Sequence, residues 1–213
     1  MNILCFGDSN TWGYKPDKTG RFNENIRWTA LLQKKLGPEY HIIEEGLCGR
    51  TTVFHDELRE GRRGLDMIGV TVEMHDPLDL VIIMLGTNDC KTRYGASASV
   101  IAKGLDQVIR KARLNASQPF DLLVISPIHL GHGVGEQDFD PEFDQNSEFV
   151  SRNLADEYRK VALQNHAAFL NAADFASPSA TDREHLNEAG HAALADAVYN
   201  KILALRKGLA NVI

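Results

Sequence analysis

Residues 80–89 read LVIIMLGTND: six apolar residues lead directly into a polar turn. An apolar run of this length is far too short to span a membrane. It fits a strand that is buried on both faces, as the strands of a parallel sheet are. Similar short runs recur along the chain at Ile3–Phe6, His41–Glu44, Leu122–Ile125 and Ala167–Leu170. The sequence therefore predicts five buried strands.

Between these runs, apolar residues recur at the three- and four-residue spacing of amphipathic helices. Strands that alternate with helices indicate right-handed crossover connections and a doubly wound α/β sheet. Because no linker, repeat or low-complexity tract interrupts the pattern, we expect one domain over residues 1–213. The predicted helices lie at Trp28–Leu36, Ile101–Ala112, Val150–Val161 and Leu194–Leu205.

The composition is that of an ordinary globular protein, with 43% hydrophobic and 24% charged residues. The net charge of −6 argues against a protein that binds nucleic acid or an anionic membrane, since either needs a basic surface. Three widely spaced cysteines, Cys5, Cys48 and Cys90, form neither a disulfide framework nor a zinc motif. Met1 leads straight into an apolar run with no basic segment before it, so we expect no signal peptide and a cytoplasmic protein.

Polar segments follow each of the five predicted strands. In doubly wound sheets the ligand binds beyond the carboxyl ends of the strands, so we expect a functional site where these segments meet. They are Gly7–Asn10, Gly46–Thr51, Gly86–Asp89, Ser126–Ile128 and, after a loop, Asp182–His185.

The turn after the first strand does not match the known phosphate-binding loops. A Walker loop requires Gly-Lys-Ser/Thr and a dinucleotide fingerprint requires G-x-G-x-x-G, and Gly7–Gly13 supplies neither. Asp8 also fits poorly as a phosphoryl acceptor of the DxD type, because Asn10 stands where the second carboxylate would be.

Ser9 is better explained as a nucleophile. A serine hydroxyl attacks only when a neighbouring base takes its proton. His185 is the predicted base, and Asp182 three residues earlier can hold its Nδ1–H and leave Nε2 free for Ser9. The backbone N–H groups of Ser9 and Gly49 and the side-chain amide of Asn88 are the predicted donors to a tetrahedral oxyanion.

Two other interpretations of these residues are weaker. Ser9 taken alone is typical of a helix cap, but the presence of a predicted base and of predicted oxyanion donors favours a nucleophile. Asp182 and His185 could ligate a divalent metal ion, since carboxylate and imidazole both bind such ions. Too few further ligands are evident, so we predict no metal and no cofactor.

Taken together, the segments resemble those of the SGNH hydrolases, also called the GDSL esterase/lipase family. The four family blocks occur in order as Gly7-Asp8-Ser9, the block around Gly49, Gly86-Thr87-Asn88-Asp89 and Asp182-x-x-His185. The resemblance implies a three-layer α/β/α fold with a flavodoxin-like five-stranded parallel sheet. It also implies Ser-His-Asp ester chemistry, with oxyanion donors from the Ser, Gly and Asn blocks.

Residues 44–52 and 80–89 are also similar to the bacterial arylesterase and acyltransferase branch, whose members act on short acyl esters and can be octameric. We therefore expect a serine esterase for short-chain acyl (acetyl) esters that works through an acyl-enzyme, and a homo-oligomer of up to eight subunits. Aryl esters and acetylated carbohydrates both remain open as substrates, and an alcohol could replace water as the acyl acceptor. The alternative is a binding module that recognises an acylated ligand without turnover.

Two residues depart from the family pattern and two more have open roles. Asn10 replaces the leucine that is common after the serine, and Glu44 stands where many members have asparagine. Neither change removes a catalytic group. Trp12 is predicted to lie on a loop and to line the acyl or alcohol pocket. For Arg50, a surface salt bridge is favoured over a contact with substrate.

Residues 129–145 form the one long stretch without a helical or strand pattern, and they contain five acids and no lysine or arginine. A calcium loop is excluded, because Phe143 occupies the position where an EF-hand needs glycine. We expect a flexible, acidic lid with Phe139 and Phe143 turned inward. We also expect this lid to pack at a subunit interface and to narrow the entrance to Ser9.

Overall fold

The computed structural model describes residues 1–208, and within them five parallel strands form one sheet in the order β2-β1-β3-β4-β5. Each strand coincides with one of the predicted apolar runs, which confirms the predicted α/β fold. The β3 side chains are buried on both faces, as the parallel arrangement requires. The strands are β1 (Asn2–Gly7), β2 (His41–Gly46), β3 (Leu80–Met84), β4 (Asp121–Ser126) and β5 (Ala168–Asn171).

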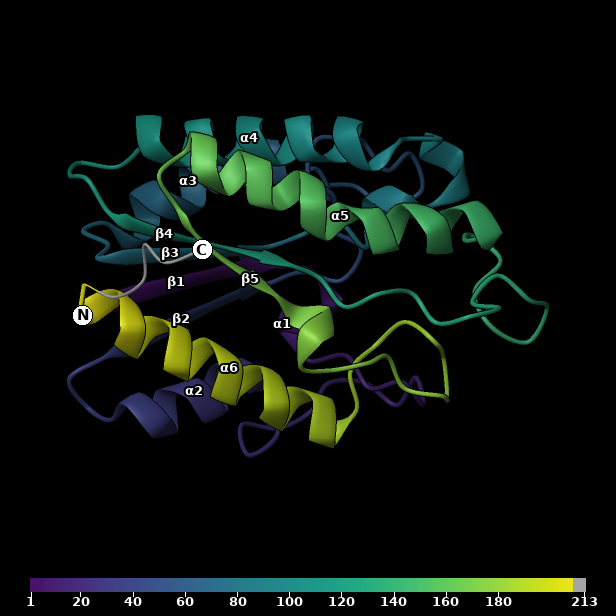
Figure 1. Ribbon diagram of the computed structural model, residues 1–213, viewed down its shortest axis with the longest axis horizontal. Helices are drawn as coiled ribbons and strands as arrows, with labels where there is room; N and C mark the ends of the chain where they lie inside the picture. The colour runs from purple at the N-terminus through teal and green to yellow at the C-terminus, as the bar shows by residue number, and fades with distance from the viewer. Residues whose placement is uncertain (209–213) are drawn as a thin grey trace.

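Helices cover both faces of the sheet and make three layers (Figure 1). One face carries α3 (Gly64–His75), α4 (Ala98–Leu114) and α5 (Gln145–Gln164), and the other carries α2 (Trp28–Leu36) and α6 (Glu188–Arg206). Each face has its own apolar core. No helix within residues 1–208 is long and apolar enough to cross a membrane.

Helix α3 is the one long helix that the sequence patterns do not predict. Its sequence, GLDMIGVTVEMH, places apolar residues all round the helix rather than on one stripe. Val70 and Met74 are consequently exposed, while Ile68 and Val72 are fully buried. The helical period is therefore obscured, and the two glycines and four β-branched residues lower the helix propensity.

The strand order places a topological switch point at β1. The chain passes from β1 to β2 on one side and then returns to β3 on the other side, so the connections after β1 and β3 diverge. A crevice opens at the carboxyl ends of the strands where such connections diverge. The turns that follow β1, β2 and β3 and the loop between β5 and α6 all reach this edge.

The segment between β4 and α5 is an irregular loop, as predicted, but its own chain anchors it. Phe143 is 2% exposed and packs into the core beneath α4 and α5. The Gly131 N–H donates to the Arg183 carbonyl at 2.7 Å, and the Gly133 N–H donates to Glu148 Oε1 at 2.6 Å. The glycine-rich half is thus tied by hydrogen bonds, which corrects the expectation of a flexible segment.

Candidate active site

Ser9 lies in the tight connection between β1 and α1 (Ser9–Trp12). The Asp8 side chain caps this short helix by accepting the N–H of Asn10 at 3.0 Å. Only glycine fits at position 7, because a Cβ there would lie 2.1 Å from Thr11 Oγ1. The strand therefore turns directly into the helix, and Ser9 is held at the sheet edge.

Three of the predicted residues form one hydrogen-bonded chain. His185 Nε2 lies 2.9 Å from Ser9 Oγ, and His185 Nδ1 lies 2.6 Å from Asp182 Oδ2. All three side chains are buried. Because the Asp182 carboxylate can only accept, Nδ1 carries the proton and Nε2 is left to accept from the serine hydroxyl.

The loop after β5 is folded around the Asp182 carboxylate. Asp182 Oδ1 accepts the backbone N–H groups of Glu184 and His185, both at 3.0 Å. The same carboxylate thus shapes the turn with one oxygen and orients the imidazole with the other. This local hydrogen bonding explains why a spacing of three residues suffices to join the two side chains.

The predicted oxyanion donors line the same cavity as Ser9. Gly49 adopts the left-handed conformation, with φ of +84°, in which other residues are strained. Asn88 Nδ2 donates to the Arg50 carbonyl at 3.2 Å. An amide nitrogen carries two hydrogens, so this bond holds the Asn88 side chain in place and leaves a second N–H for a ligand.

Arg50 is a buried structural residue, so the prediction that it forms a surface salt bridge is wrong. It is 3% exposed, and its guanidinium stacks on the Phe6 ring at 4.0 Å from the ring centroid. Its Nη1 donates to the Gly7 carbonyl at 2.9 Å. Arg50 therefore ties the turn after β2 to the end of β1, and it is not among the described residues that line the Ser9 cavity.

The two departures from the family pattern have different structural roles. Asn10 Oδ1 accepts the N–H of Leu186 at 2.9 Å, and this buried bond links α1 to the segment that carries His185. A leucine at position 10 could not form it. Glu44 instead pairs with Arg27 at 2.7 Å on β2, and it does not line the Ser9 cavity.

The cavity above Ser9 has a volume of about 480 Å³ and a largely polar wall. The Tyr14 ring packs 4.7 Å from the His185 ring, measured between centroids. Phe139, covered by the Arg183 guanidinium at 3.7 Å, comes from the loop between β4 and α5. Trp12 ends α1 instead of lying on a loop, and Tyr14, not Trp12, is among the described residues that line this cavity.

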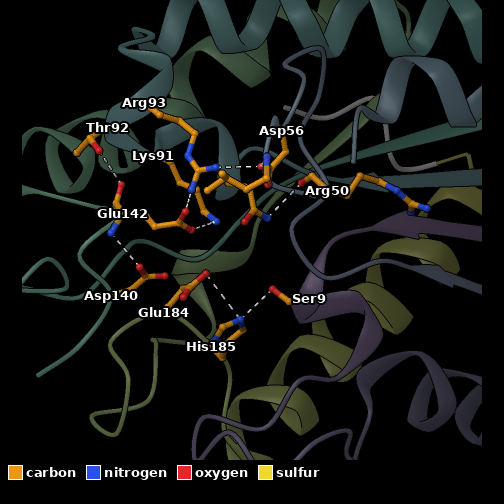
Figure 2. Close-up of polar contacts among 12 residues, drawn as sticks. Ser9, Arg50, Asp56, Lys91, Thr92, Arg93, Asp140, Glu142, Glu184 and His185 are labelled. Atoms are coloured by element: carbon orange, nitrogen blue, oxygen red, sulfur yellow. Dashed lines mark hydrogen bonds and ion pairs between the residues drawn. The ribbon is translucent and has the colours of Figure 1, made fainter. Parts of the chain in front are cut away.

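Ion pairs fasten the loop between β4 and α5 over the cavity (Figure 2). Glu142 pairs with the buried amine of Lys91 and with Arg93, and Arg93 also reaches Asp56 at 2.9 Å. These pairs join the loop to the segments after β2 and β3. Phe143 is buried within the chain and the half-buried Phe139 ring lies under the Arg183 guanidinium, so Phe143 requires no neighbouring subunit to cover it.

Glu184 is a site residue that the sequence patterns do not reveal. Its side chain is 10% exposed, and Oε1 lies 3.7 Å from His185 Nε2. Burial lowers the pKa of His185, but Glu184, Asp182 and Asp8 outweigh burial and raise the pKa to about 8. Adjacency to His185 in the sequence was the only available signal, and it does not tell which ring nitrogen the carboxylate faces.

The chain matches a known protein family. The family described as GDSL-like lipase/acylhydrolase matches residues 5–193, which is most of the chain. The chain belongs to this family. The match confirms the resemblance to SGNH hydrolases, and it covers all four sequence blocks that carry the site.

Solved structures of GDSL-family esterases have the same fold. Est24, a carbohydrate acetylesterase from Sinorhizobium meliloti, is 33% identical, with a TM-score of 0.88 over 96% of this chain and 99% of that chain. The aryl esterase of M. smegmatis is 32% identical, with a TM-score of 0.87 over the same shares of the two chains. These neighbours confirm the predicted SGNH hydrolase fold.

A curated relative is more distant. The acetylxylan esterase of Xylanibacter ruminicola is 24% identical over 93% of this chain, and the match spans 42% of that longer protein. All three relatives carry the names of carboxylic ester hydrolases, which is the enzyme class that the sequence predicts.

Proposed function

We propose that this protein is a serine esterase that hydrolyses short-chain acyl esters through an acyl-enzyme. The observation that carries the proposal is the continuous chain from Ser9 Oγ through His185 to Asp182, with bonds of 2.9 and 2.6 Å. This arrangement supplies a nucleophile, a base for its proton and a carboxylate that orients the base.

In the proposed acylation step, Ser9 Oγ attacks the ester carbonyl carbon while its proton passes to His185 Nε2. The carbonyl oxygen becomes an oxyanion, which the N–H groups of Ser9, Gly49 and Asn88 stabilise. When this intermediate collapses, the bond to the alcohol oxygen breaks and His185 returns the proton to that oxygen. Asp182 stabilises the imidazolium between the two transfers.

In the deacylation step, a water molecule gives its proton to His185 and attacks the acyl carbon. Collapse of the second intermediate breaks the bond to Ser9, which recovers its proton, and the free acid leaves. An alcohol can replace water at this stage, and the product is then a new ester. The names of two relatives, an acetylxylan esterase and a carbohydrate acetylesterase, support a preference for acetyl and other short acyl groups.

Hydrolysis of 4-nitrophenyl acetate tests the proposal against the alternative of a binding module. We expect the wild-type protein to release 4-nitrophenol catalytically, with turnover well beyond one equivalent per chain. A Ser9→Ala variant should show only the background rate. Binding of the ester without turnover by the wild-type protein would favour the binding module.

The esterase should require no metal ion. No group of three or more histidine, cysteine, aspartate or glutamate side chains within residues 1–208 is arranged to hold one. We therefore expect prolonged treatment with EDTA to leave kcat and KM for an acetate ester unchanged. Loss of activity that a divalent ion restores would contradict the triad mechanism.

The pH profile should follow the titration of His185, which accepts the Ser9 proton only when it is neutral. Since its pKa is raised to about 8, kcat/KM should rise with pH through that value and then level off. Glu184→Gln removes the largest of the raising influences, so the midpoint should move to lower pH. The comparison uses kcat/KM of both enzymes over one pH series.

A matched control for this shift is Asp138→Asn. Asp138 lies exposed on the rim of the same cavity, so its loss removes an equal charge that water already screens. The control should keep the wild-type midpoint. Equal midpoints in the wild type and Glu184→Gln would show that Glu184 does not set the basicity of His185.

The assembly of the chain is also a proposal, supported by the similarity to the arylesterase branch. We propose a homo-oligomer, up to an octamer. Exposed apolar side chains on two neighbouring helices, Val70 and Met74 of α3 and Leu114 of α4, are candidates for burial between subunits. Light scattering of the purified protein decides the point, and a monomeric mass would contradict it.

A further inference from the structure

The carboxylate of Glu184 occupies a distinct position in the active-site cavity. It lies in the cavity wall, and Figure 2 shows Glu184 and Ser9 approaching the His185 ring along separate directions. Its Oε1 is 3.7 Å from Nε2, the nitrogen that also contacts Ser9 Oγ at 2.9 Å. The acid therefore faces the reacting side of the imidazole, whereas Asp182 holds the opposite side.

Among the described residues, none donates a hydrogen bond to the Glu184 carboxylate. Across residues 1–208, the polar contact found for its oxygens is the 3.7 Å approach to His185, which is too long for a hydrogen bond. Burial accordingly raises the pKa of Glu184, and His185 and Lys91 offset this only in part. The oxygens face the cavity and are not fully enclosed, so they can accept a hydrogen bond from a group that enters the cavity with the substrate.

The chemistry of the site identifies which part of the substrate arrives there. His185 Nε2 protonates the oxygen of the departing alcohol, so that oxygen must lie beside Nε2 when the ester bond breaks. Groups within reach of Glu184 Oε1 therefore belong to the alcohol and not to the acyl chain. A vicinal hydroxyl, on the carbon adjacent to the one that bears the ester oxygen, is placed to donate a hydrogen bond there.

We propose that Glu184 is a specificity-determining residue that accepts a hydrogen bond from a vicinal hydroxyl of the leaving alcohol, on the carbon adjacent to the one that bears the ester oxygen. The enzyme then favours esters of polyhydroxylated alcohols over esters of simple alkyl or aryl alcohols. This inference rests on the proposed esterase function, and it decides between the two substrate classes that the sequence left open. The largely polar cavity wall suits such an alcohol better than an aryl ring.

Two acetate esters that differ by one hydroxyl test the proposal: trans-2-hydroxycyclohexyl acetate and cyclohexyl acetate. The quantity compared is the ratio of their kcat/KM values, measured above the pH at which His185 titrates. Any effect of a substitution on the triad alters both esters alike and cancels in the ratio. We expect the wild-type enzyme to prefer the hydroxylated ester.

Glu184→Met removes the acceptor with little change in side-chain length, and the ratio should fall by about tenfold or more, the usual worth of a hydrogen bond to a charged group. Glu184→Gln keeps a neutral acceptor and should lower the ratio less. Asp138→Asn, on the exposed rim, should keep the wild-type ratio.

The outcomes separate this inference from the function on which it rests. An unchanged ratio in Glu184→Met overturns the role of Glu184, while hydrolysis of both esters leaves the esterase function intact. If Glu184→Met does not fold, an unchanged ratio in Glu184→Gln overturns it in the same way. Failure of the wild-type enzyme to hydrolyse either ester overturns the esterase function and the inference together.

Discussion

Replacing Ser9 by alanine should lower kcat for an acetate ester by about 10⁶-fold, the size of loss seen when a triad nucleophile is removed. In the proposed mechanism, the hydroxyl is the group that forms the bond to the acyl carbon, and His185 and Asp182 act only through it. The fold should be unaffected, since Ser9 contributes one small buried side chain at the start of α1. The measurement is kcat of a Ser9→Ala preparation that is free of wild-type enzyme. Thermal unfolding of both proteins checks the fold.

Ser126→Ala is the matched control for this substitution. Ser126 is buried at the end of β4 and loses the same hydroxyl, but it takes no part in the Ser9–His185–Asp182 chain. We expect its activity to stay close to that of the wild type. A Ser9→Ala enzyme that retains a substantial fraction of wild-type turnover would rule out Ser9 as the nucleophile.

Replacing Asn88 by alanine should lower kcat by about 10²–10³-fold, the usual loss for one oxyanion donor, with a smaller change in KM. In the proposed mechanism, the amide stabilises charge that develops only in the transition state, so its loss affects the chemical step more than ground-state binding. Steady-state kinetics on a single acetate ester separates the two parameters. A rise in KM at constant kcat would instead identify Asn88 as a residue that binds the ground state.

The strands could be predicted because parallel strands buried on both faces are short apolar runs. Residues 80–85 carry that signal without ambiguity, and β3 is found there. The residues that come together around Ser9 could also be predicted, since a doubly wound sheet gathers the ends of its strands at one edge. A local turn is enough to bring the side chains of Asp182 and His185 into contact.

The remaining features depend on contacts between residues far apart in the chain. Arg50 carries a charge that favours the surface, but the Phe6 ring and the Gly7 carbonyl hold it in the interior. Asn10 receives its hydrogen bond from Leu186, 176 residues away. Helix α3 was hidden because its apolar residues surround the helix, and no spacing rule distinguishes its buried side from its exposed one.

The prediction that Trp12 lines the cavity is wrong for a similar reason, since Tyr14 lines it instead. Both aromatic residues follow Ser9 closely, and their ring centroids lie 6.2 Å apart. The four-residue helix α1 decides which of them faces His185, because the chain turns at Gly13 in the left-handed conformation. Composition and spacing do not predict the direction of that turn.

Covalent labelling with an alkyl fluorophosphonate tests the central claim most directly, because the reagent forms a bond only with a serine that a neighbouring base activates. The account predicts that the intact protein gains the mass of one phosphonyl group per chain and that peptide mass spectrometry locates it on Ser9. His185→Ala should abolish the reaction without unfolding the protein. An unlabelled wild-type protein, or a label that is found on a residue other than Ser9, would contradict the mechanism.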